Sequence, residues 1–92
     1  MSHSSCCGGF TPYSKDIPMD ALDAFHEAME GFVGVGYEPL CYASQVVQGT
    51  NYCFFCNATL VVADPVVYPA FVEVFKPLEG KACITHISKG KH

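Results

Sequence analysis

Cysteine and histidine are the side chains of this sequence that could serve as nucleophiles, redox centres or metal ligands. The chain has 92 residues, with six cysteines and four histidines. Cys53 and Cys56 form a CxxC pair, whose sulfurs must converge to hold a metal or to exchange electrons. Residues three apart in a strand point to opposite faces, which places Cys53 outward and Cys56 inward. The pair is therefore interpreted as structural.

The other candidates for chemistry have no better spacing. None of the histidines stands at ligand spacing from a cysteine, and the adjacent Cys6 and Cys7 are weak evidence for a metal or oxidation site. The four acidic residues between Asp20 and Glu30 are typical of a solvated helix face. A cysteine hydrolase needs a placed Cys–His pair, and none can be assigned. We therefore expect no enzyme, no metal site and no cofactor.

Composition narrows the class of protein further. Half of the residues are hydrophobic, 15% are charged and the formal net charge is −4, which is typical of one small globular domain. The lysines are dispersed, so nucleic acid is not an expected partner, and no apolar run approaches the ~20 residues of a membrane span. The first ten residues lack the basic and apolar regions of a secretion signal. A cytoplasmic protein with reduced thiols is expected; a start after a removed signal is the alternative.

Periodicity predicts one helix followed by strands. Apolar side chains recur at spacings of three and four from Pro18 to Phe32, with Asp16 as the expected N-cap region and glycines at the end. Strand patterns then cover residues 37–44, 50–62, 70–76 and 82–88, joined by turns at 45–49 and 77–80 and by a longer connection at 63–69.

The order of these elements predicts an α+β fold, with one helix packed across a four- to five-stranded antiparallel sheet. Residues 1–15 are expected to form a flexible N-terminal arm, residues 16–88 the domain and residues 89–92 a tail.

The segment Gln45–Tyr52, which reads QVVQGTNY, resembles the first hairpin of the cystatins, QxVxG followed by TNY. Gly8-Gly9 resembles the N-terminal glycines of that family, and Val74–Glu79 resembles the second hairpin of the stefins, its intracellular single-domain members. The resemblance spans residues 8–88 and implies the cystatin-like version of the α+β fold. The chain departs from the secreted cystatins in having no tryptophan and a different cysteine layout, and the connection at 63–69 is unlike the usual one.

The resemblance implies a reversible inhibitor of papain-like cysteine proteases that blocks the active-site cleft with a wedge of arm and two hairpins. Independently of it, two valines in an expected turn indicate a tip that another molecule covers. The alternatives are a cystatin-fold interaction module without inhibitory activity and a thiol-dependent metal or redox protein. The implied protease-binding residues are Gly8, Gly9, Gln45, Val46, Val47, Gln48, Gly49, Pro77 and Leu78.

The alternation of the strands also predicts the two faces of the sheet. A first hairpin symmetric about Val47 places Cys41 opposite Cys53, as a reduced pair on the outer face. The helix side then receives Leu40, Tyr42, Phe54 and Cys56, and the outer face also receives Phe55, Phe71, Glu73, Phe75 and Ile84. Such an apolar outer face predicts a homodimer through it, or one made by exchange through an opened 45–49 hairpin. The alternative is that the arm, the connection at 63–69 or the tail covers it.

Overall fold

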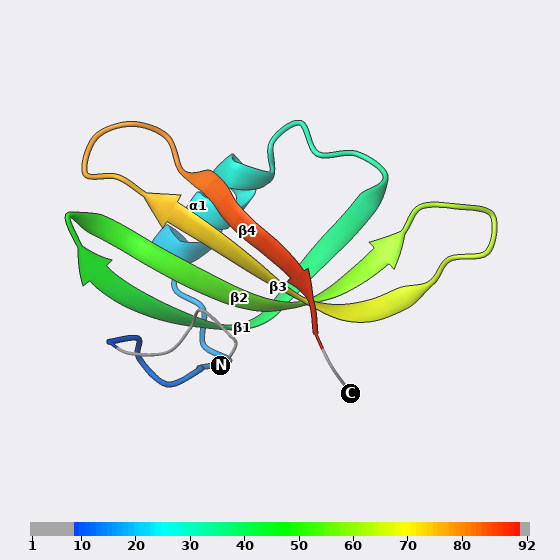
Figure 1. Cartoon of the computed structure of the whole chain (residues 1–92), viewed down its shortest axis with the longest axis horizontal. Coiled ribbons are helices and arrows are strands. Elements are labelled where there is room, and N and C mark those ends of the chain that lie inside the picture. The colour runs from blue at the N-terminus through cyan, green and yellow to red at the C-terminus, as the bar shows by residue number, and fades with distance from the viewer. Residues whose placement is uncertain (1–8, 91–92) are drawn as a thin grey trace.

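The computed structural model describes residues 9–90 as one helix lying across one face of an antiparallel sheet (Figure 1). The helix α1 spans Met19–Met29, and the strands β1 to β4 span Val35–Val47, Gly49–Leu60, Val67–Lys76 and Cys83–Lys89. The strands follow one another in the sheet in chain order. The predicted α+β arrangement of a helix on an antiparallel sheet is therefore confirmed. No helix in the described part of the chain is long and apolar enough to cross a membrane.

The helix is shorter than the sequence pattern predicted. Its N-cap is Pro18 in extended conformation, without a side-chain cap, so the prediction of Asp16 in that role is wrong. At the other end Glu30 leaves the helical conformation and Gly31 adopts a φ of +90°, which turns the chain away after Met29. Phe32 consequently lies outside the helix and is 49% exposed, instead of continuing its buried stripe.

The core lies between α1 and the inner face of the sheet. Ala21 and Ala24 let the helix approach closely, and the ring of Phe25 meets that of Phe54 edge-on with centroids 4.9 Å apart. Around this pair the sheet contributes buried residues from its two central strands and from the entry to β4, namely Tyr52, Cys56, Val72, Val74 and Ala82.

The first hairpin is centred on Gln48, one residue beyond the predicted centre. Ala43 therefore lies opposite Cys53, and Cys41 opposite Phe55, so the predicted pairing of Cys41 with Cys53 is wrong. Cys41 is a free thiol and Cys53 is disulfide-bonded, so the expectation of reduced thiols is wrong for Cys53.

The faces of the sheet follow the predicted alternation with two exceptions. Cys56 packs in the core under the helix, while Cys53 is buried on the outer face beside Tyr13, so the opposite orientation of this pair is confirmed. A bulge between Pro39 and Cys41 leaves Leu40 exposed instead of on the helix side. Ile84 packs against the core, so its predicted place on the outer face is wrong.

Residues before the helix cover part of the outer face and one edge of the sheet. Ser14 and Tyr42 exchange two backbone hydrogen bonds, and the Thr11 N–H donates to the Ser44 carbonyl at 2.8 Å. Tyr13 thereby reaches the outer face, where its hydroxyl oxygen lies 3.3 Å from the Cys53 sulfur and its ring 6.4 Å from that of Phe71. This segment falls within the expected flexible arm. The homodimer through the outer face stays a prediction.

Candidate functional site

Three segments far apart in the sequence meet at one end of the sheet, which we call the hairpin edge: Gly9, residues 45–49 and residues 77–82. Thr50 pairs with Lys76, so the β1–β2 turn and the β3–β4 loop leave adjacent strand ends (Figure 1). A β-carbon built on Gly9 would lie 2.8 Å from Gln45 Nε2, so the chain at Gly9 passes directly over the first hairpin. The structure thus brings together the predicted site residues that it describes; Gly8 lies outside the described residues.

The tips of the two hairpins are apolar and exposed. Val46 is 81% exposed and Leu78 is 79% exposed, while Val47 and Gln48 are also exposed and Pro77 is half-buried. Each apolar Å² removed from water contributes about 25 cal/mol, so a groove that encloses both tips would gain binding free energy without any reaction at these residues. The arrangement is suited to binding by burial.

Gly49 is the residue that allows the first turn to lie against the end of β3. Its φ is +116°, and a β-carbon there would approach the Lys76 carbonyl oxygen to 2.5 Å and the Phe75 ring to 2.9 Å. Both the backbone conformation and the lack of space require glycine. The glycine of the QxVxG motif is therefore explained by the packing of the turn on β3.

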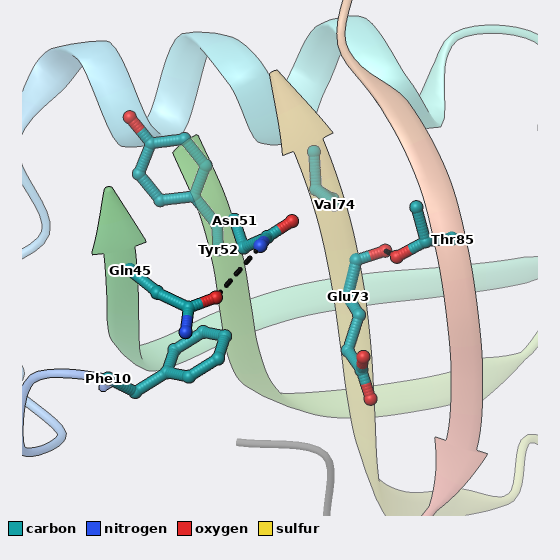
Figure 2. A pocket seen from close by; sticks show the side chains of 7 residues that line it. All are labelled: Phe10, Gln45, Asn51, Tyr52, Glu73, Val74 and Thr85. Atoms are coloured by element: carbon teal, nitrogen blue, oxygen red, sulfur yellow. Dashed lines mark hydrogen bonds between the residues drawn. The ribbon is translucent and has the colours of Figure 1, made fainter. Parts of the chain in front are cut away.

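Gln45 points toward the outer face, where it is part of a small polar pocket (Figure 2). Its Oε1 accepts a hydrogen bond from Asn51 Nδ2 at 2.9 Å. Burial raises the pKa of the Glu73 carboxyl in this pocket, and His86 opposes that shift. The pocket has a volume of about 170 Å³ and is lined by Phe10, Gln45, Asn51, Tyr52, Glu73, Val74 and Thr85. With Gly9 passing over it, Gln45 serves to seat the N-terminal segment on the hairpin.

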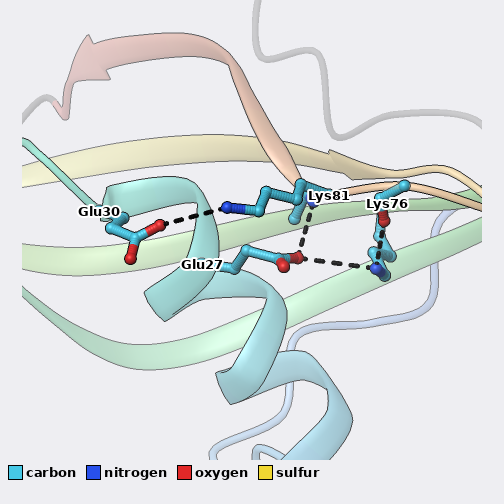
Figure 3. A network of polar contacts seen from close by, with 6 residues as sticks. Glu27, Glu30, Lys76 and Lys81 are labelled. Carbon is cyan, nitrogen blue, oxygen red and sulfur yellow. Dashed lines mark hydrogen bonds and ion pairs between the residues drawn. The ribbon is translucent and has the colours of Figure 1, made fainter.

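The β3–β4 loop is attached to the helix by a polar network (Figure 3). The Ala82 N–H donates to Glu27 Oε1 at 2.8 Å, and the Lys76 ammonium lies 3.6 Å from the same oxygen. Lys76 Nζ also donates to the Gly80 carbonyl at 2.6 Å. The hydrogen bond from Ala82 is the main cause of the lowered pKa of Glu27, to which Lys76 and Lys81 also contribute while desolvation opposes it.

Sequence reasoning missed this network and the seating of Gly9. It placed Glu27 on a solvated helix face, because acidic residues on that side of the helix are ordinarily solvated. The hydrogen bond from the Ala82 N–H to Glu27 spans 55 residues, and no local pattern encodes a contact of that separation. Lys76, directly before Pro77, stands within the second hairpin motif, and nothing in that motif indicates its contact with the helix.

The free thiols in the core and on β1 are not activated. Burial raises the pKa of Cys56 to about 12 and also raises that of Cys41. A raised pKa lowers the thiolate fraction on which nucleophilic and ligand chemistry depends. Within residues 9–90, no group of three or more histidine, cysteine or acidic side chains could hold a metal ion.

No protein-family model, curated protein or solved structure matches the chain. The function of the hairpin edge is therefore inferred from its own residues and geometry.

Proposed function

We propose that this chain is a cystatin-like inhibitor of papain-like cysteine proteases, whose hairpin edge enters and blocks the active-site cleft. The observation that carries the proposal is the placement of two exposed aliphatic side chains, Val46 and Leu78, on adjacent turns with Gly9 alongside. The resemblance of the two hairpin sequences to those of cystatins and stefins supports the same proposal.

The physical argument for inhibition is that the edge offers a protease groove exposed apolar groups on turns whose shape is already held. Burial of Val46 and Leu78 supplies free energy. Gly9, which has no side chain, lets the backbone lie close to another chain. The turns are held before binding by the close packing of Gly49 on β3 and by the bond from Ala82 to Glu27, so little ordering entropy is lost in the complex.

Titration against papain tests the proposal. The expected result is stoichiometric, reversible and competitive loss of activity, with recovery of active papain on dilution. Papain whose catalytic cysteine carries a small alkyl group should still bind the protein in calorimetry. The reason is that binding involves no covalent bond to that cysteine. Full papain activity in the presence of excess protein would refute the inhibitor function for this class. It would leave the cystatin-fold interaction module as the function to pursue.

A further inference from the structure

We infer that Glu27 of α1 is a positioning residue for the β3–β4 loop, and that it fixes how Leu78 is presented at the hairpin edge. The part of this inference that concerns protease binding rests on the proposed function. The part that concerns the loop itself does not.

The bond from Ala82 to Glu27 is buried on the donor side. Ala82 is only 6% exposed, and its N–H donates to Glu27 Oε1 at 2.8 Å. A buried backbone N–H that loses its acceptor is strongly penalised, because water does not replace the lost bond. The carboxylate of the helix therefore determines where the chain runs as it enters β4 at Cys83.

Lys76 extends this fixation to the other side of the loop. Its ammonium lies 3.6 Å from Glu27 Oε1 and donates to the Gly80 carbonyl at 2.6 Å. Leu78 is midway between Lys76 and Gly80 in the chain, so the backbone on both sides of its exposed side chain is held. Gly80 has a φ of +113°, which turns the chain back toward Ala82. The loop is thus shaped before any partner arrives, which reduces the cost of ordering it on binding.

A second glutamate, Glu30 just after the end of the same helix, provides a natural comparison. Glu30 pairs with Lys81 at 3.8 Å, but their side chains are 74% and 77% exposed. Exposed pairs of this kind contribute little, because solvent screens them and the side chains lose entropy. Glu27 accepts a hydrogen bond from a buried backbone N–H, whereas Glu30 is paired with an exposed lysine. The inference depends on this difference.

The first readout is amide hydrogen exchange at Ala82, measured by NMR on the free protein. Glu27→Ala should speed this exchange by about tenfold or more, since the amide loses its acceptor. Glu30→Ala is the matched control and should leave Ala82 exchange unchanged. Glu27→Gln should rescue part of the protection, because the amide oxygen still accepts from Ala82 but no longer attracts Lys76.

The second readout is the inhibition constant against papain. Glu27→Ala should weaken inhibition about three- to tenfold, the cost of ordering one loop on binding, while Glu30→Ala should have no effect. In a Leu78→Ala background the penalty of Glu27→Ala should shrink, because the side chain that it positions is gone. An undiminished penalty in that background would assign Glu27 a general structural role and overturn the inference.

The outcomes separate the two proposals. If Ala82 exchange is the same in Glu27→Ala and wild type, the positioning of the loop is refuted. If exchange rises but inhibition does not change, the effect on Leu78 is refuted. If the wild-type protein leaves papain fully active, the proposed function fails, and the exchange data still decide whether Glu27 holds the loop. Should Glu27→Ala not fold, Lys76→Met, which keeps the aliphatic stem, is expected to raise exchange at residues 80–82.

Discussion

The two ends of the sheet both expose large apolar side chains, yet they are built differently. At the end opposite the hairpin edge, which we call the valine end, Val33 and Val61 are 88% and 71% exposed, beside Phe32, Val62, Val66 and Val67. Its loops are joined by backbone hydrogen bonds, from the Val61 N–H to Gly34 at 3.0 Å and from the Leu60 N–H to Val66 at 2.9 Å. At the hairpin edge, the loops are held by side chains and packing from neighbouring elements. These are the carboxylate of Glu27, the ammonium of Lys76 and the close packing of Gly49.

Exposure of apolar groups therefore does not by itself distinguish a binding surface. The valine end exposes more large apolar side chains than the hairpin edge does. At the hairpin edge, long-range contacts fix the conformation of the loops that carry them. Binding free energy depends on the surplus left after ordering costs, so a prearranged loop with one leucine can contribute more than a longer stretch of exposed valine.

The largest effect is expected from glycines, one at each end. Gly49→Ala should reduce the free energy of unfolding by about 2–4 kcal/mol, because strain at its φ of +116° adds to the contact with the Lys76 carbonyl. Gly34→Ala, at a φ of +90° with nothing within 4 Å of the new β-carbon, should cost only about 1 kcal/mol. Urea unfolding of both variants measures the difference. Equal losses would show that crowding at Gly49 is relieved elsewhere.

The next effect concerns binding and compares a valine from each end. Val47→Asp should weaken inhibition of papain by about 100-fold, because the carboxylate would be desolvated in the cleft. Val62→Asp introduces the same charge at an exposed position of the valine end and should leave inhibition unchanged. Competitive inhibition assays give both constants. A comparable loss in the two variants would move the binding surface away from the hairpin edge.

The smallest effect is a difference in the pH at which each end of the sheet loses stability. The lowered pKa of Glu27 means that the folded state favours its carboxylate, so this stabilisation is present above the ordinary pKa of 4.5 and is lost as the pH falls below it. Tyr37, at the valine end, has a pKa raised above 10.0 by burial and then by Tyr68, so ionisation above that pH favours the unfolded state. Amide signals of Ala82 and of Ala58, which pairs with Tyr37, should broaden first in acid and in alkali respectively. Simultaneous loss of both signals in acid would contradict this.

The helix and the strands were predictable because their patterns are local. The recurrence of Leu22, Phe25 and Met29 indicated the helix, but the pattern continued to Phe32 past the point where Glu30 ends it. In the first hairpin, moving the turn from Val47 to Gln48 changed every partner yet left Cys41 and Cys53 on one face. The reason is that the shift displaces one strand by two residues along the other, which preserves the alternation of side chains.

The residues of the candidate site were predictable only where they lie in hairpin motifs. Val46, Val47 and Leu78 are exposed as expected of tips. The motif did not indicate the bond of Gln45 to Asn51 beneath the N-terminal segment, and its role in protease binding stays a prediction. The contact of Glu27 with Ala82 depends on how the helix crosses the sheet, which no local sequence pattern specifies.

The bonds that Thr11 and Ser14 make to β1 have a consequence for how this sheet can grow. They occupy backbone groups of Tyr42 and Ser44 on the β1 border of the sheet, while β4 is the last strand of the described residues at the other border. An added strand from a second chain can pair along the whole length of β4, whereas along β1 it would have to displace Thr11 and Ser14 or stop before Tyr42. Two copies joined through β4 would use up that border in both, so growth beyond the pair would have to use the border at β1.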